Sequence, residues 1–586
     1  MNNHTCFPDP VTEIVQRYFG IEYLFPWQRL VVANILDAVE AAKATDAVAS
    51  TGATGATVTP AVTAATLATA EAVTTSASAA RDGGSPGDEL YDEDGVLRGN
   101  QIVLLPTGAG KSLCFQVPAL MLEGATLIVY PLLALMGDQA RRMNQGGLDP
   151  AIFRGSQTHE EREAQFKRLE GKDGRPPARL VIANPEVLQG EEIISRIAKR
   201  GVDHIAIDEA HCISEWGDTF RPVYLELKKI AERLKPRAVT AFTATASPRT
   251  LTRIAEALFD GRAHIVRGDS DRPNILYSVY HCRAKEAALI REVARRERPM
   301  IVFCATRGGT ERTAHLLRET LEDTDIRFYH AGLQKEEKIA LETWFLAHER
   351  AILCCTCAFG MGVDKKNIRT VIHRDAPPTV EAYVQEAGRG GRDGAIAEAV
   401  LLWSPADRKR LEKLPSPAKE RASVLISFAE SGRCRREVLL EALGDPKANA
   451  RGGEQIACTG CDICDGKAVQ YPRDEQLVID YIAKNKRAFT GEEAADTLYM
   501  TGNRISRERT GYHEWRRSDF PAIINDLVKE KKLIRIDKWP WKDKLTIPKD
   551  SGVRFTRRPR VGKNPFFPVL TLFPMHLHPR RSRLQK

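Results

Sequence analysis

A glycine-rich segment between the apolar runs 101–105 and 113–120 is the part of the sequence best suited to binding phosphate. Its members are Pro106, Thr107, Gly108, Ala109, Gly110, Lys111 and Ser112. A strand, a glycine loop and a helix in this order form a phosphate-binding loop, whose backbone N–H groups contact phosphate oxygens. Lys111 then reaches the β- and γ-phosphates, and Ser112 ligates Mg²⁺. A chance glycine turn is the alternative, because Leu105 stands where the strict pattern has glycine.

An acidic pair, Asp208 and Glu209, ends the apolar run 204–207. An aspartate at the end of a strand can hold Mg²⁺, and a neighbouring glutamate can activate the water that attacks a phosphoryl group. Alone, the pair would fit a charged strand terminus. Together with the phosphate-binding loop upstream, it predicts a nucleotide hydrolase.

Two arginines three residues apart, Arg389 and Arg392, lie in the polar segment 384–394. On a helix they would share a face and could stabilise negative charge on a γ-phosphate. The glycine-containing segment 357–367 supplies Asp364 just upstream, at the same predicted cleft. Each piece alone is compatible with an exposed loop, but together they fit one ATP site shared by two domains.

Three cysteines, Cys458, Cys461 and Cys464, are spaced C-x₂-C-x₂-C, and Cys434 lies upstream of them. Four thiolates can complete a tetrahedral Zn²⁺ shell, although an iron–sulfur cluster uses the same ligands. Twelve cysteines in 586 residues are too few for a disulfide scaffold, which favours a reducing compartment. The cysteines of 354–357 lie in and just after an apolar run, where ordinary core packing is expected.

Parallel sheets are the elements that would position these groups. Short apolar runs recur at 101–105, 126–131, 179–185, 204–209 and 239–244, and again at 301–306, 326–330, 351–356, 370–373 and 399–403. Runs buried on both faces and separated by helix-length segments indicate parallel sheets covered by helices. The sequence thus predicts two α/β domains that meet near 269–274.

The rest of the chain differs in composition from these two domains. Residues 41–80 include 16 Ala and 10 Thr, which predicts a flexible insertion, with an Ala-rich helix as the competing interpretation. Beyond the cysteines, helical patterns at 475–485, 490–499 and 517–530 precede a hairpin pattern at 533–547, as in a small winged-helix module. Trp539 and Trp541 at the hairpin tip would stack on bases, unless they pack on the helices.

The expected divisions follow from these patterns. They are a first α/β domain of residues 1–36 and 99–270, an insertion of 37–98, a second α/β domain of 271–405, a cysteine-bearing subdomain of 406–468, a winged-helix module of 469–549 and a basic tail of 550–586.

The positive charge is concentrated at the end of the sequence. The net charge is +9, and 551–586 holds nine basic and no acidic residues. Such a tail suits a polyanion such as nucleic acid, or serves only as a solubilising end. The sequence has neither an apolar run of about 18 residues nor a secretory pattern at its start, so neither a membrane partner nor secretion is expected.

The motifs taken together resemble those of RecQ-type DNA helicases, within helicase superfamily two. The matching segments are 25–28, 106–116, 131–139, 208–224, 241–246, 329–333, 358–373 and 385–394. This resemblance implies two RecA-like domains, a zinc-binding subdomain around Cys434 and 458–464, and a winged helix that contacts duplex DNA.

The resemblance also implies roles for individual residues. Gln28 would recognise adenine, Lys111 and Asp208 would bind nucleotide and Mg²⁺, and Glu209 would be the catalytic base. Gln385, Arg389 and Arg392 would complete the catalytic set from the second domain. Trp216, Phe220 and Arg221 would belong to an aromatic-rich loop that couples DNA contact to hydrolysis, unless the two aromatic residues simply pack the domain.

Three positions in two segments depart from the family pattern. Asp218 and Thr219 replace the usual His-Asp of the aromatic-rich loop, so different coupling of DNA contact to hydrolysis is expected. Phe25 replaces an arginine usual beside Gln28, which leaves Phe25 or Tyr23 to pack against adenine.

The expected function is that of an ATP- and Mg²⁺-dependent 3′–5′ DNA helicase that acts on single-stranded and forked DNA in repair and recombination. An RNA helicase and a non-unwinding DNA-binding or annealing protein are the alternatives. The expected location is the cytoplasm of a bacterium, in association with the nucleoid, or the nucleus of a eukaryote. The sequence does not identify protein partners.

Overall fold

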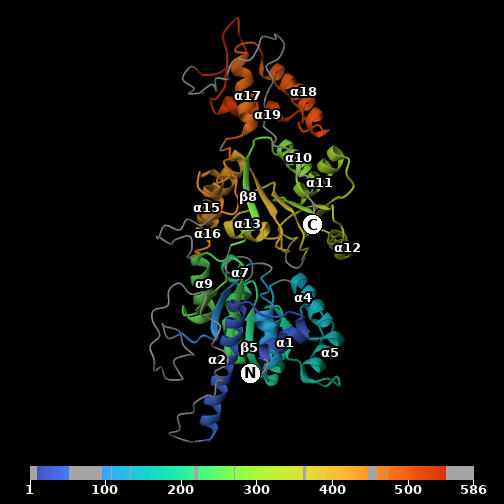
Figure 1. Ribbon diagram of the computed structural model, residues 1–586, viewed down its shortest axis with the longest axis vertical. Helices are drawn as coiled ribbons and strands as arrows, with labels where there is room; N and C mark the ends of the chain where they lie inside the picture. Colours follow the sequence, from blue (N-terminus) through green and yellow to red (C-terminus); the bar gives the residue numbers. More distant parts are fainter. Residues whose placement is uncertain are drawn as a thin grey trace, which may run out of the picture.

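The computed structural model describes most of the chain. The described ranges are 9–51, 96–106, 109–131, 133–216, 222–268, 271–359, 365–416, 418–445, 458–469 and 471–548. Two α/β lobes and a smaller helical module follow one another along the long axis of the molecule (Figure 1). Among the helices in these ranges, none is both long and apolar enough to cross a bilayer.

The first lobe is built on a parallel sheet of seven strands within the described ranges, in the order β3-β4-β2-β5-β6-β1-β7. The strands are β1 (Asn100–Leu104), β2 (Ala125–Val129), β3 (Ala151–Phe153), β4 (Leu180–Ala183), β5 (Val202–Ile207), β6 (Ala238–Thr243) and β7 (His264–Arg267). Every residue of β2, β4 and β5 is buried, as expected for strands covered on both faces. The residues that follow β1, β5 and β6 therefore meet at one edge of the sheet.

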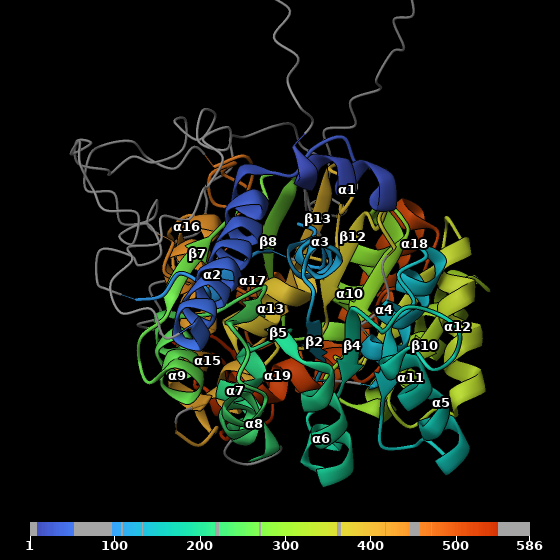
Figure 2. The same ribbon diagram turned by 90° about the horizontal axis from the view of Figure 1, so that it is seen from below.

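Helices cover both faces of this sheet. They are α1 (Pro10–Phe19), α2 (Pro26–Thr51), α3 (Leu113–Met121), α4 (Leu133–Gln145), α5 (His159–Glu170), α6 (Glu191–Arg200), α7 (His211–Trp216), α8 (Leu227–Leu234) and α9 (Pro248–Phe259). One core contains α2, α3 and α4, and the other contains α5 to α9. Figure 2 shows α3 and α6 on opposite sides of the strands.

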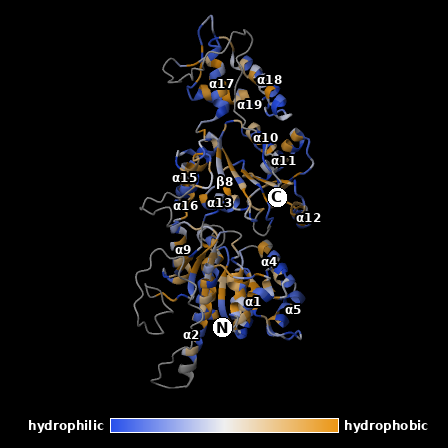
Figure 3. Cartoon of the chain, viewed as in Figure 1, coloured by the Kyte–Doolittle hydropathy of each residue, from blue (hydrophilic) through white to orange (hydrophobic). Residues whose placement is uncertain are grey.

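The second lobe has a parallel sheet of six strands in the described ranges, in the order β10-β11-β9-β12-β13-β8. Its strands are β8 (Ile275–His281), β9 (Met300–Phe303), β10 (Ile326–Tyr329), β11 (Ile352–Cys355), β12 (Thr370–His373) and β13 (Ala397–Trp403). Its helices are α10 (Lys285–Arg295), α11 (Arg307–Leu321), α12 (Lys335–Ala347) and α13 (Val380–Ala387). Figure 3 shows hydrophobic residues along the strands at the centre of the lobes.

The cysteine-bearing segment packs against the second sheet. Its helices are α14 (Pro405–Glu412), α15 (Ala418–Glu430) and α16 (Arg435–Ala442). Leu425, Phe428 and Val438 from these helices share one core with Tyr277 of β8 and Tyr383 of α13. The segment is therefore continuous with the second lobe.

The C-terminal module has the element order predicted for a winged helix. Helices α17 (Arg473–Lys484), α18 (Gly491–Thr510) and α19 (Asp519–Lys529) precede an antiparallel hairpin of β14 (Ile534–Arg535) and β15 (Leu545–Thr546). Its core includes Ala284 and Ala287, at the start of α10, so the module packs on the second lobe.

Two expectations about local structure were wrong. Helix α2 continues to Thr51, so 37–51 is not part of a flexible insertion. The helix is held there by buried Ala38 and Val39 and by ion pairs of Lys43 with Glu123 and of Arg237 with Asp46. The expected flexibility of 52–95 and the basic tail both lie outside the described residues. The short strands β3 and β7 and the seven-residue strand β8 had no predicted counterpart.

Candidate functional site

The predicted phosphate-binding loop connects the end of β1 to α3. Pro106 follows β1, and Ala109 to Ser112 lead into α3, while Thr107 and Gly108 lie outside the described residues. Gly110 has a φ of +75°, and an added Cβ would lie 2.7 Å from Nε2 of Gln28. A side chain at position 110 would therefore be strained and would collide with Gln28.

Gln28, at the start of α2, makes contacts with this loop. Its Nε2 donates to the carbonyl oxygens of Ala109 and Gly110, at 3.0 and 3.4 Å. Its Oε1 accepts from the backbone N–H of Phe25 at 2.8 Å. Gln28 thus joins the loop to the backbone of Phe25. The rings of Tyr23 and Phe25, where the sequence predicted adenine packing, are exposed.

The acidic pair lies beside the lysine of the loop. Nζ of Lys111 is 3.4 Å from Oε1 of Glu209. Burial raises the pKa of Asp208 to about 6, although the charge of Lys111 opposes this shift. Burial also acts to raise the pKa of Glu209, but the charges of Lys111, His211 and Arg389 outweigh it and hold that pKa below its ordinary value. Glu209 is consequently ionised at neutral pH, as a base must be.

His211 and Thr243 belong to this site but were not assigned from the sequence. Nδ1 of His211 lies 3.3 Å from Oε2 of Glu209 and 3.3 Å from Oγ1 of Thr243. The Thr243 hydroxyl donates to the carbonyl of Thr245 at 3.0 Å. Thr243 ends β6, which lies between β1 and β5 in the sheet, so strand order brings it here. The polar end of the apolar run 239–244 was the available signal.

The second lobe contributes Arg389, from the turn after α13. Arg389 is 5% exposed, and burial together with neighbouring Arg392 lowers its pKa to about 10. The charges of Arg389 and Glu209 each act on the pKa of the other, so Arg389 lies near the acidic pair of the first lobe. Gln385 and Arg392, which are close to Arg389 in the sequence, are half-buried. The charge of Glu386 also acts on the pKa of Arg389, and its carboxylate accepts a hydrogen bond from Nε2 of buried His373 at 3.0 Å.

Several predicted residues cannot be placed. Asp364, Phe220 and Arg221 lie outside the described residues, and so does the side chain of Trp216, whose backbone ends α7. The aromatic-rich loop and the role of Asp364 therefore remain predictions.

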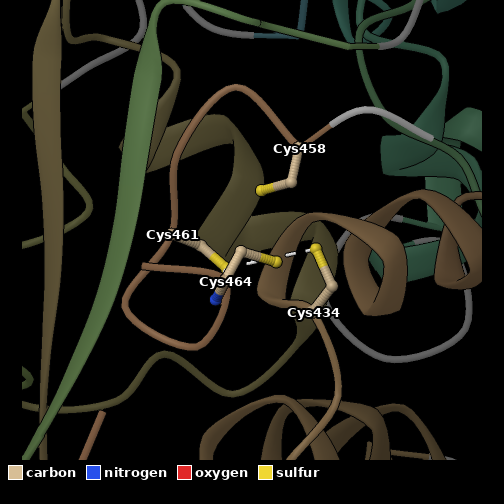
Figure 4. A group of neighbouring side chains, drawn as sticks. All are labelled: Cys434, Cys458, Cys461 and Cys464. Carbon is tan, nitrogen blue, oxygen red and sulfur yellow. Dashed lines mark hydrogen bonds between the residues drawn. The ribbon is translucent and has the colours of Figure 1, made fainter. Parts of the chain in front are cut away.

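The four predicted cysteine ligands converge, as Figure 4 shows. Their sulfur atoms all lie within 4.8 Å of one another, and those of Cys434 and Cys461 are 4.0 Å apart. A single Zn²⁺ with bonds of about 2.3 Å holds tetrahedral thiolates roughly 3.8 Å apart, so the cysteines fit one zinc ion. An iron–sulfur cluster fits less well, because its four thiolates are divided among two or four irons and would spread farther apart.

The other cysteine group has no such convergence. Cys354 and Cys355 are buried in β11, as expected of core residues. Cys357 is exposed in the turn that follows, so the expectation of core packing was wrong for this residue. Strand β11 ends at Cys355, before Cys357.

The tip of the C-terminal hairpin exposes aromatic surface. Trp539 is 89% exposed and Trp541 is 43% exposed. The guanidinium carbon of Arg487 lies 4.6 Å from the centre of the Trp541 ring. Trp539 therefore does not pack on the helices, whereas Trp541 has a partner on the module itself.

Comparison with known proteins identifies helicase domains in both lobes. The family model described as DEAD/DEAH box helicase matches residues 93–254, and the model described as helicase conserved C-terminal domain matches residues 284–394.

The chain is also similar to curated full-length proteins. It is 33% identical over 423 residues to the ATP-dependent DNA helicase RecQ of Bacillus subtilis (strain 168), covering 70% of this chain and 69% of that protein. It is 36% identical over 424 residues to the RecQ helicase of Pasteurella multocida (strain Pm70), covering 70% of this chain. The chain spans 63% of the length of the P. multocida protein and 58% of that of a Haemophilus influenzae relative.

Similarity to solved structures is weaker. The DUF1998 helicase MrfA bound to DNA aligns with 77% of this chain and 58% of its own, at 17% identity and a TM-score of 0.46. This score is too low to support an argument.

Proposed function

The chain belongs to the RecQ family of DNA helicases, and we propose that it hydrolyses ATP to move 3′ to 5′ along single-stranded DNA and separate the strands of duplex or forked DNA. The main support is that Lys111 lies 3.4 Å from Glu209 on the first lobe, and that Arg389 of the second lobe is near enough for its charge to help lower the pKa of Glu209. A phosphoryl group bound there would contact a cation on each side and a base, which suits hydrolysis.

Each of these residues has a distinct part in the proposed reaction. Lys111 contacts Glu209, so phosphate oxygens compete with that carboxylate for the ammonium group. Glu209, ionised at neutral pH, accepts a proton from the attacking water. Arg389 neutralises the charge that develops on the γ-phosphoryl group. Closure of the two lobes brings the three groups together, and reopening advances the contacts with DNA.

The residues present suit Mg²⁺ and zinc as well. Asp208 is a buried carboxylate at the end of β5, and Ser112 precedes α3, which are oxygen donors of the kind Mg²⁺ prefers. Mg²⁺ would neutralise charge on the β- and γ-phosphates. Cys434, Cys458, Cys461 and Cys464 would hold zinc in a structural role, joining the start of α16 to 458–464.

The proposed nucleic-acid contacts lie at two places. The aromatic-rich loop with Trp216, Phe220 and Arg221 would sense the single strand next to the ATP site. The hairpin tip would meet the junction of a fork, because an exposed ring such as that of Trp539 can stack on a base. A DNA substrate places the protein with the chromosome, and repair and recombination are the processes that need such unwinding.

ATP hydrolysis and strand separation test the proposal. Wild type, Lys111→Ala and Glu209→Gln are compared on forked, duplex and single-stranded DNA and on matched RNA. We expect single-stranded DNA to stimulate the wild-type ATPase and forked DNA to be unwound, with both activities lost in the variants. Unwinding of RNA alone would favour an RNA helicase. Binding or annealing of DNA without stimulated hydrolysis would contradict the proposed motor.

A further inference from the structure

The segment 271–275, which joins the two lobes, holds the turn that carries Arg389. Nη1 of Arg272 donates to the carbonyl of Gly388 at 3.1 Å. Its Nη2 donates to the carbonyls of Gly390 and Gly391, each at 3.0 Å. One planar guanidinium group thus fixes the backbone on both sides of Arg389.

A second side chain of the same segment fixes the end of this turn. Nδ2 of Asn274 donates to the carbonyls of Gly391 and Ala395, each at 2.8 Å. Gly391 has a φ of +56°, and a Cβ there would lie 2.5 Å from Nδ2 of Asn274. The turn 388–391 is therefore shaped around the side chains of the joining segment.

The joining segment is held in turn by Arg436 of α16. This arginine is 1% exposed and pairs with Asp271. Its Nη1 donates to the carbonyl of Arg272 at 3.0 Å, and its Nη2 to that of Ile275 at 2.7 Å. Arg436 follows Cys434, one of the four clustered cysteines, by two residues. Thr459, next to Cys458 in the cluster, donates from its Oγ1 to the carbonyl of Pro273 in the joining segment at 2.6 Å. A continuous set of contacts therefore runs from the cysteine cluster to the turn that carries Arg389.

We propose that Arg272 is a positioning residue for Arg389, and that Arg436 makes this positioning depend on the cysteine cluster. The proposal rests on the proposed ATPase, because Arg389 must act on the γ-phosphoryl group for its placement to matter. Since Arg389 is buried, it acts only where its backbone puts it. A displacement of about 1 Å at such a group can lower turnover about a hundredfold.

A double-mutant cycle separates positioning from a general loss of structure. We expect Arg272→Ala to lower kcat between about tenfold and a hundredfold, with the nucleotide Kd changed less than about threefold. In an Arg389→Ala background the same change should lower kcat less than about twofold, because the group that it positions is gone. Equal losses in both backgrounds would overturn the proposal.

Arg267→Ala is the matched control. Arg267 ends β7, just before the same joining region, and its Nη1 donates to the carbonyl of Gly444, outside the turn 388–391, at 2.9 Å. We expect this variant to keep wild-type kcat. A loss equal to that of Arg272→Ala would mean that any cut contact in this region has the same effect, and the proposal would fail.

Amide hydrogen exchange gives a readout that does not depend on activity. Arg272→Ala and Arg436→Gln should both speed exchange in 388–394, and Arg436→Gln should do so while zinc content, measured with a chromophoric chelator, stays at one ion per chain. Unchanged exchange in both variants would overturn the inference even if wild type is an active ATPase. A wild type without ATPase activity would instead overturn the proposed function on which the inference rests.

Discussion

On the first lobe, the ends of β1, β5 and β6 place Lys111, Glu209 and Thr243 close together. On the second lobe, Arg389 lies in a turn that is held by the side chain of Arg272, which is 116 residues from its hydrogen-bond partner Gly388 in the sequence. The first arrangement comes with the sheet itself, because neighbouring parallel strands end at one edge. The second depends on side-chain contacts between distant segments. Substitutions in the first lobe should therefore remove reacting groups, whereas substitutions around the turn of the second lobe should mostly displace Arg389.

Lys111→Ala should have the largest effect. It removes the cation that contacts Glu209 and that would bind phosphate, so we expect ATPase activity below about a thousandth of wild type. Steady-state hydrolysis with single-stranded DNA measures this, with melting temperature as the control for folding. More than a tenth of wild-type activity would show that the first lobe does not hold the phosphate in this way.

Arg389→Lys tests the second lobe with charge retained. A lysine keeps the positive charge but loses the planar fork, so we expect kcat to fall about a hundredfold, with a small change in nucleotide Kd. Single-turnover hydrolysis and binding of a fluorescent ATP analogue measure the two quantities. If binding is lost and kcat is kept, the arginine serves affinity and the proposed difference between the lobes disappears.

The pH dependence should belong to the first lobe. Because the pKa of Asp208 is raised to about 6, this carboxylate is ionised above that pH and protonated below it. Protonation removes a charge needed to hold Mg²⁺, so kcat/KM should fall about tenfold between pH 7 and pH 5. Arg389→Lys should keep the same acid limb, since the arginine does not titrate in this range. A shift of this acid limb in Arg389→Lys would show that the two lobes are coupled more closely than we propose.

Loss of the cysteine cluster should act on the second lobe alone. Cys461 is buried in the core shared with β8, so Cys461→Ser should release zinc and lower the melting temperature by about 5 °C. We expect a loss of kcat of about fivefold through the turn at 388–391. Hydrogen exchange should rise in α15 and α16 and stay unchanged in β1, β2 and β5. Faster exchange throughout the first sheet would contradict this separation.

Trp539→Ala should have the smallest effect. The ring is 89% exposed, so its removal should leave stability and single-stranded-DNA-stimulated hydrolysis unchanged. Strand separation on forked DNA should slow about threefold, because one stacking contact at the junction is lost. Trp541→Ala provides a comparison, since that ring contacts Arg487. A fall in ATPase activity for Trp539→Ala would place its role in the motor and not at the fork.

The sequence predicted the site unevenly, and the unevenness has physical causes. The motifs around Lys111, Asp208 and the clustered cysteines could be predicted, because strand ends and short ligand spacings are local features of the chain. Helix α2 beyond residue 36 could not, since its last turns are stabilised by ion pairs with Glu123 and Arg237. Strand β3 has only three residues, too few for its pattern to stand out from its surroundings.

The amino-acid sequence alone therefore predicted the two α/β domains, the grouping of Lys111 with the acidic pair of the first lobe and the convergence of the four cysteines. Apolar periodicity and ligand spacing depend only on neighbouring residues, so they can be recognised before the chain is folded. Only the tertiary structure decided that His211 and Thr243 adjoin Glu209, and that Arg272 and Arg436 support Arg389. Those contacts join residues far apart in the chain, and packing brings them together only after both sheets have formed.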